Sequence, residues 1–86
     1  MNKEDIIELN PNMMFMDGFD DAIVGVCYQY GRPPVVAYSL RKVITKLMED
    51  GMTEEEALEY WEFNQLGAYM GENTPVFIEQ EDEVKS

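Results

Sequence analysis

The chain has 86 residues and a formal net charge of −12, with no histidine and a single cysteine. Its length gives room for one domain, and a hydrophobic content of 45% argues against a fully disordered acidic chain. No apolar run approaches the roughly 20 residues that cross a bilayer, and the acidic N-terminus lacks the basic start of a signal peptide, so we expect a cytoplasmic protein without membrane contact.

The charge is also unevenly distributed along the chain. No basic residue occurs between Lys46 and Lys85, whereas twelve acidic residues do: Glu49, Asp50, Glu54, Glu55, Glu56, Glu59, Glu62, Glu72, Glu79, Glu81, Asp82 and Glu83. Such a negative field repels nucleic acid and anionic membranes and attracts basic surfaces over long range. We therefore expect no direct binding to nucleic acid and a partner with a basic surface.

The first residues have no single interpretation. Residues 2–9 form either a short helix or a loose arm, which the following Asn-Pro-Asn ends. Residues 13–16 are apolar and leave open an extra strand. We assign residues 1–12 to an N-terminal arm, residues 13–79 to a single domain and residues 80–86 to an acidic tail.

A β-hairpin is predicted next. An acidic turn at residues 17–21 leads into a strand-like run at residues 22–30, within which Gly25 suggests a bulge. Residues 31–34, Gly-Arg-Pro-Pro, reverse the chain, and residues 35–38 form the return strand.

Two helices are predicted to follow the hairpin. Ser39 is placed as the N-cap of the first helix, and Gly51 ends it. Its apolar residues recur at helical spacing and are expected to pack inward: Leu40, Val43, Ile44, Leu47 and Met48. In the second helix, Thr53 and Glu56 form a capping box.

The second helix is predicted to have two contrasting sides. At about 100° per residue, one side carries Ala57, Tyr60, Trp61, Asn64 and Ala68, and the other carries Glu55, Glu59 and Glu62. Asn64 and Gln65 would then need hydrogen-bond partners, because an unpaired buried amide costs about 1–3 kcal/mol. Phe63 and Leu66 fall toward the acidic side, where they are either covered by a terminus or exposed to a partner.

The chain is predicted to end in a third strand. Gly67 and Gly71 are candidate helix exits, and Thr74-Pro75 leads into a strand at residues 76–78. The order is strand, strand, helix, helix, strand (ββααβ). It predicts a small α+β domain whose helices pack on one face of an antiparallel sheet.

Two sequence blocks are similar to known proteins. "DGFDDAIVG" (residues 17–25) and "EFNQLGAYMGENTPVF" (residues 62–77) resemble a group of short acidic proteins encoded by bacteriophages and prophages. The likeness covers most of residues 15–78. Because the activity of that group is undetermined, the resemblance implies a viral setting in a host-cell cytoplasm but no catalytic or ligand role.

The residue types present argue against catalysis. The absence of histidine excludes Ser-His and Cys-His nucleophilic pairs and His-containing zinc sites, and no glycine-rich stretch has the form of a phosphate-binding loop. Asp17, Asp20 and Asp21 lack the spacing of a calcium loop and are more typical of a capped strand end. We expect no enzymatic activity, no cofactor and no metal. A metal-dependent enzyme that uses these three residues and Glu72 is the least favoured alternative.

The remaining signals favour binding to a protein. Glu55, Glu59 and Glu62 can capture a basic surface of a host protein, as a small inhibitor or modulator and by mimicry of nucleic acid, although a solvated acidic face is the commoner interpretation of such a pattern. Phe63 and Leu66 are candidate apolar anchors, and the loop residues Tyr69, Glu72 and Asn73 are further candidates for partner contact.

Two further interpretations remain open from the sequence. Met13, Met14, Met16 and Met70 lie next to loops and suit an adaptable contact patch, whereas Met48 suits the core. The alternative function is a self-assembling structural protein, a homodimer formed through an exposed strand edge with Phe63 and Leu66, in which the acidic charge serves solubility.

Overall fold

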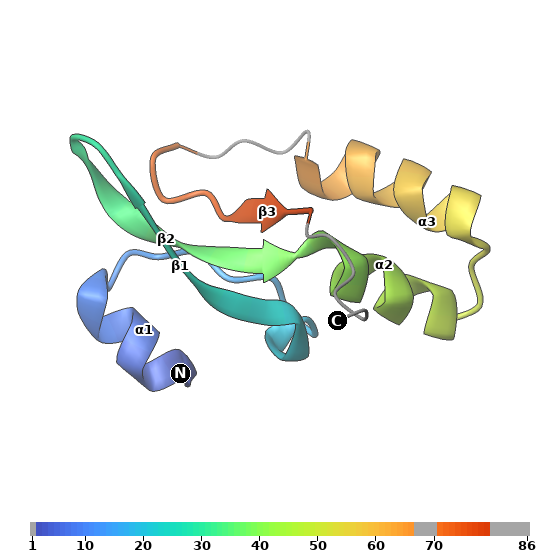
Figure 1. Ribbon diagram of the computed structural model, residues 1–86, viewed down its shortest axis with the longest axis horizontal. Coiled ribbons are helices and arrows are strands. Elements are labelled where there is room, and N and C mark those ends of the chain that lie inside the picture. The colour runs from blue at the N-terminus through green and yellow to red at the C-terminus, as the bar shows by residue number, and fades with distance from the viewer. Residues whose placement is uncertain (1, 67–70, 80–86) are drawn as a thin grey trace, which may run out of the picture.

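The computed structural model describes residues 2–66 and 71–79, with the side chains of Gln65 and Leu66 excepted (Figure 1). It confirms the α+β class and the ββααβ order that follows the N-terminal segment. In chain order the elements are α1 (Lys3–Leu9), the 3-10 turn η1 (Asp20–Ala22), β1 (Ile23–Gln29), β2 (Arg32–Ser39), α2 (Leu40–Glu49), α3 (Glu54–Trp61), the π-helical turn η2 (Glu62–Leu66) and β3 (Val76–Ile78).

The sheet has the order β1-β2-β3 and is mixed. β1 and β2 are antiparallel, but β3 runs parallel to β2 and pairs with it from Ala37↔Val76 to Ser39↔Ile78. The expectation of an antiparallel sheet was therefore wrong for β3. Figure 1 shows the reason: α2 continues away from the end of β2 and α3 comes back, so that β3 sets out in the same direction as β2. Parallel strands require a crossover of this kind.

The hairpin is confirmed, with a tighter turn than the sequence suggested. The turn is at Tyr30 and Gly31, whose positive φ of 72° suits glycine, and β2 begins at Arg32. Pro33 and Pro34 therefore lie in the strand and not in the turn. Both prolines fall in the register shift between Cys27 and Gln29, and β3 pairs only with the far end of β2, so their missing N–H groups interrupt no regular pair on either side. The bulge expected at Gly25 is present as a register shift beside it.

The N-terminal segment is a helix joined to the core. Asn2 caps α1 by accepting a hydrogen bond from the Asp5 backbone N–H at 2.9 Å, and Ile6 is fully buried. The buried Asn10 Nδ2 donates to the Pro34 carbonyl oxygen at 2.8 Å and to Asn73 Oδ1 at 2.9 Å. These bonds hold the end of α1 against both β2 and the turn before β3. Residues 13–16 form no strand.

The predicted caps of α2 and α3 are confirmed. Ser39 Oγ accepts from the Lys42 backbone N–H at 3.2 Å, and α2 ends before Gly51, where φ is 109°. At α3 the capping box is complete: Thr53 Oγ1 accepts from the Glu56 N–H at 3.1 Å, and Glu56 Oε1 accepts from the Thr53 N–H at 3.0 Å. Both helix starts could be predicted from the sequence because each N-cap depends on residues only three positions apart.

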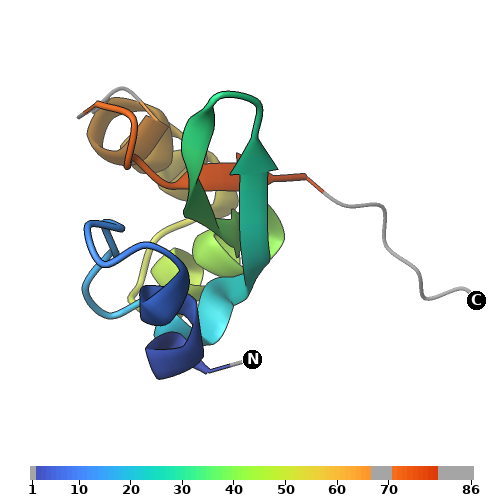
Figure 2. The same ribbon diagram turned by 90° about the vertical axis from the view of Figure 1, so that its left-hand side faces the viewer.

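One hydrophobic core joins all these elements. Figure 2 shows α1, the following loop and α3 on the same side of the β1-β2 hairpin. Two methionine assignments were wrong: Met13 is buried in this core, whereas Met48 is 42% exposed at the flank of α2. The core consists of Ile6, Met13, Ala22, Val36, Tyr38, Val43, Ile44, Leu47 and Ala57.

Candidate partner-binding surface on α3

Little of α3 is buried in the core. Ala57 is its only fully buried residue, and Trp61 is half-buried, with its ring edge-on to Phe77 at a centroid distance of 5.5 Å. Phe77 in turn stacks on Tyr38 at 5.9 Å. A small residue and one aromatic contact are therefore enough to dock this helix, and most of its surface faces solvent.

The π-helical turn η2 changes which side chains face outward. Asn64 was expected in the buried sector, but it is exposed, and its Nδ2 donates to the Tyr60 carbonyl oxygen of its own helix at 3.1 Å. Tyr60 is also 41% exposed. The prediction for Asn64 was wrong because it assumed 100° per residue, and a π-helical turn is wider than an α-helical one. Tyr60 precedes this turn, within α3, so the wider turn does not account for its exposure.

The acidic residues predicted on α3 do share an outward surface. Glu55, Glu59 and Glu62 are all exposed, and within the described residues none of them forms an ion pair. Phe63 follows Glu62 directly and is 82% exposed. The structure therefore places a large apolar side chain beside carboxylates that have no internal partner.

The other predicted contact residues lie elsewhere or outside the described part. The side chain of Leu66 and the whole of Tyr69 are not among the described residues, and the same holds for Ala68 and Met70. Glu72 is exposed in the turn before β3. Asn73 is half-buried and serves the fold: its side chain binds Asn10, and its carbonyl oxygen accepts from the Met14 N–H at 3.4 Å.

Three hollows border α3, and the sequence predicted none of them. One lies between α2 and α3, with Arg41, Glu54 and Leu58 in its lining; the other two share residues of α3. The loop pocket, about 360 Å³, lies between residues 14–19, the end of α3 and the start of β3, and its apolar lining includes Met14, Met16, Phe19, Pro75 and Phe77. The helix pocket, about 480 Å³, is lined by Met52, Glu56, Glu59 and Phe63. Tyr60 and Asn64 line both hollows. The methionines next to the loop were the one sequence signal near this site: Met14 and Met16 line the loop pocket, Met13 is buried in the core, and a contact patch stays a prediction.

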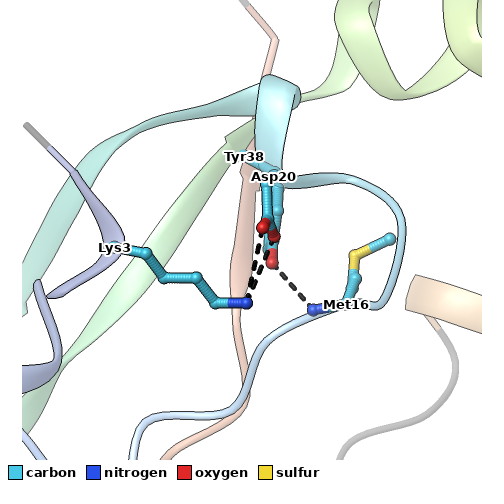
Figure 3. A network of polar contacts seen from close by, with 4 residues as sticks. All are labelled: Lys3, Met16, Asp20 and Tyr38. Atoms are coloured by element: carbon cyan, nitrogen blue, oxygen red, sulfur yellow. Dashed lines mark hydrogen bonds and ion pairs between the residues drawn. The ribbon is translucent and has the colours of Figure 1, made fainter.

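A polar network fixes the loop that walls the first pocket. Figure 3 shows that the Tyr38 hydroxyl accepts a hydrogen bond from the Met16 backbone N–H at 2.8 Å, while Lys3 Nζ pairs with Asp20 Oδ1 at 3.3 Å. The same Nζ lies 4.8 Å from the centre of the Phe15 ring. Burial raises the pKa of Tyr38; the bond from Met16 acts in the opposite direction, and the charge of Asp20 adds to the rise. The hydroxyl thus stays neutral and holds the loop.

The acidic turn has a structural use. Asp20 begins η1 and is engaged by Lys3, while Asp17 and Asp21 are exposed. Across the described ranges no group of three acidic, histidine or cysteine side chains is arranged to hold a metal ion. Nor is any helix in those ranges long and apolar enough to cross a membrane.

No protein-family model, curated protein or solved structure matches this chain. The resemblance of residues 17–25 and 62–77 to phage-encoded proteins stays a prediction. The function of this protein must therefore be inferred from the surface of α3, the loop pocket and the helix pocket.

Proposed function

We propose that this protein is a non-enzymatic binding protein that captures a basic surface of a host protein with the outer face of α3. One observation carries the proposal: Glu55, Glu59 and Glu62 are exposed without ion-pair partners in the described residues, next to an 82% exposed Phe63. The sequence resemblance to phage-encoded proteins supports a bacterial host as the source of the partner.

The two kinds of side chain would act at different stages of binding. The carboxylates attract a basic surface over distances up to the Debye length, about 8–10 Å in ordinary salt, and so increase the association rate. Phe63 contributes once contact is made, because full burial of such a side chain stabilises by about 1.5–3 kcal/mol. Capture would therefore be sensitive to salt, and dissociation would depend on the apolar contact.

Mimicry of nucleic acid is a narrower version of the same function. Glu55 and Glu59 are four residues apart, which corresponds to about 6 Å along the helix axis. One strand of duplex DNA carries a charge about every 3.4 Å. A single row of carboxylates on α3 has little more than half that density, so we expect a partner with a basic surface in general and inhibition of a nucleic-acid enzyme as one form of it.

Affinity capture tests the proposal. The tagged protein is incubated with a bacterial lysate at low and high salt, alongside a variant in which Glu55, Glu59 and Glu62 are replaced by Lys. We expect a partner that the wild type retains at low salt only and the variant does not retain. Circular dichroism checks that the variant is folded, and a triple Glu→Gln variant separates loss of attraction from repulsion. Retention of the same partner by all three proteins would refute the proposal.

Self-association is a second candidate, favoured by the edge of the sheet. β1 is an edge strand of seven residues without a charged side chain, and the nearby Tyr28 and Tyr30 are 71% and fully exposed. Such an edge can pair with a second copy, although the two register shifts in β1 oppose regular pairing. Native mass spectrometry at low and high salt decides: a dimer insensitive to salt favours self-association, and a monomer at both salts argues against it.

A further inference from the structure

The loop pocket and the helix pocket meet at shared residues. Tyr60 and Asn64 line both of them, and both residues are exposed. The loop pocket and the helix pocket therefore form one surface feature, which we call the α3 groove, with Tyr60 and Asn64 at its middle. It crosses the helix next to the carboxylates discussed above.

The lining of the α3 groove combines apolar surface with negative charge. Methionine, phenylalanine and proline side chains line the loop pocket, with Asp17 among them, and Glu56 and Glu59 line the helix pocket. No lysine or arginine of the described residues lines either hollow. Glu56 is committed to the cap of α3, so Asp17 and Glu59 remain as carboxylates for a ligand. Apolar ligand groups with cationic neighbours match this lining.

The volume of the loop pocket limits the size of the ligand group that it can hold. At about 360 Å³ it lies at the small end of ligand sites, which span about 300–1,000 Å³. This volume is sufficient for one large apolar side chain. The exposed Phe63 forms part of the lining of the helix pocket, where it can contact the same ligand.

The loop pocket is held in shape by bonds to its backbone, while its side chains can adapt. The Tyr38 hydroxyl fixes the Met16 N–H, and the Asn73 carbonyl oxygen accepts from the Met14 N–H. Both methionines are half-buried, and Met16 also packs against the core. Unbranched thioether side chains suit apolar groups of different shapes. A fixed backbone lowers the entropic cost of binding, and the side chains provide the fit.

We propose that the α3 groove binds a short segment of the partner protein, with a large apolar side chain in the loop pocket and a lysine or arginine on each side of it, opposite Asp17 and Glu59. The proposal rests on the proposed function, because it specifies which part of a basic partner the protein grips. Electrostatic capture by the carboxylates needs no apolar group on the partner, whereas binding in the groove does.

A titration with defined peptides tests the groove without a known partner. The probes are Lys-Lys-Gly-Gly-Phe-Gly-Gly-Lys-Lys and the same peptide with Ala in place of Phe, added to the 15N-labelled full chain and followed by amide chemical shifts. We expect the Phe peptide to shift the amides of Met14, Met16 and Phe77, and to bind at least about tenfold more tightly than the Ala peptide. The Ala peptide should shift α3 amides only.

Outcomes against the groove differ from outcomes against the proposed function. Equal affinity and equal shifts for the two peptides would overturn the groove while leaving electrostatic capture intact, and so would the absence of binding by either peptide if the lysate partner is still captured. The same amides could also shift when the protein concentration is raised without any peptide. That result would show that the groove binds a second copy of the chain, and it would also overturn the proposal.

A steric block at the middle of the groove provides a matched comparison. Asn64→Trp places a bulky neutral side chain between the two pockets without a change in charge, and within the described residues the Asn64 side chain hydrogen-bonds only to its own helix. Asn12→Trp is the control, because Asn12 is exposed and lines neither pocket. We expect Asn64→Trp to remove the tenfold advantage of the Phe peptide and Asn12→Trp to keep it. The peptide pair on the wild-type chain remains decisive if either variant is unstable.

Discussion

The neighbouring helices α2 and α3 use their apolar residues in different ways. α2 buries Val43, Ile44 and Leu47 in the core, whereas α3 buries only Ala57. Tyr60 of α3 is 41% exposed, and Phe63 of the following turn η2 is 82% exposed. α2 therefore stabilises the fold, while the exposed apolar side chains of α3 and η2 are accessible to another molecule.

The two helices also differ in the charges they carry. α2 carries Arg41, Lys42 and Lys46 together with Glu49, and so has both signs. α3 and η2 carry only acidic charges, from Glu54 to Glu62. A mixed surface is typical of solvated helices, whereas a surface of one sign beside exposed aromatic residues is more selective in what it attracts. From this comparison we expect that substitutions in α2 mainly change the stability of the fold, and that substitutions on α3 mainly change the proposed binding.

A leucine in each helix gives the largest expected difference in stability. Leu47 is buried in α2, so Leu47→Ala should lower the free energy of unfolding by about 2–5 kcal/mol. Leu58 in α3 is 38% exposed, and Leu58→Ala should cost less than half as much. Urea denaturation followed by circular dichroism measures both. Equal losses would break the proposed division between the two helices.

The Tyr38 hydroxyl is expected to matter next. Tyr38→Phe leaves the Met16 N–H without its acceptor and should cost about 1–3 kcal/mol. It should also flatten the pH dependence of stability at alkaline pH. The folded-state pKa of Tyr38 is raised, so its contribution is complete below the unfolded pKa of about 10 and is lost as pH rises through the folded value.

The measurement for Tyr38 is urea denaturation of both proteins at neutral pH and at several pH values above 10. The wild type should lose stability more steeply than Tyr38→Phe over the alkaline range. Parallel curves would show that the hydroxyl does not titrate with the fold.

The capping box of α3 is expected to have a smaller effect. Thr53→Ala removes the acceptor for the Glu56 N–H and should lower stability by about 1 kcal/mol. Thr45→Ala, at an exposed position in the middle of α2, is the control and should change stability by less than about 0.5 kcal/mol. Thermal melting separates the two. If Thr53→Ala matches the control, the start of α3 contributes nothing to the fold.

Phe63 should have the smallest effect on stability and a large one on binding. Because its side chain is 82% exposed, Phe63→Ser should change the free energy of unfolding by no more than about 0.5 kcal/mol. Retention of the lysate partner should nevertheless fall. A marked loss of stability would place Phe63 in the fold rather than at an interface.

The sequence predicted those features whose causes are local. The Ser39 cap, the Thr53 and Glu56 box and the Gly25 bulge each depend on neighbours a few residues apart, and all three are present. The direction of β3 depends on how two helices return the chain, which no short pattern encodes. For this reason the sheet was expected to be antiparallel.

In the candidate site too, the features with local causes were predicted and those with long-range causes were not. The outward carboxylates of α3 followed from helical periodicity, and the error at Asn64 began where η2 departs from that periodicity. The loop pocket could not be predicted, because it joins Met14 and Met16 to Tyr60 and to Phe77 across the whole chain. The position of Met14 and Met16 next to a loop suggested a contact patch, but not which residues would face them.

The most direct test of the central claim compares two variants with the same net charge. In one, Glu55, Glu59 and Glu62 on the outer face of α3 are replaced by Lys; in the other, the exposed Glu4, Glu8 and Glu49 of α1 and α2 are replaced by Lys. The amount of partner retained from a bacterial lysate is measured for both. We predict that the α3 variant loses the partner and that the other variant keeps most of it. Equal losses would mean that overall charge, and not the surface of α3, determines binding.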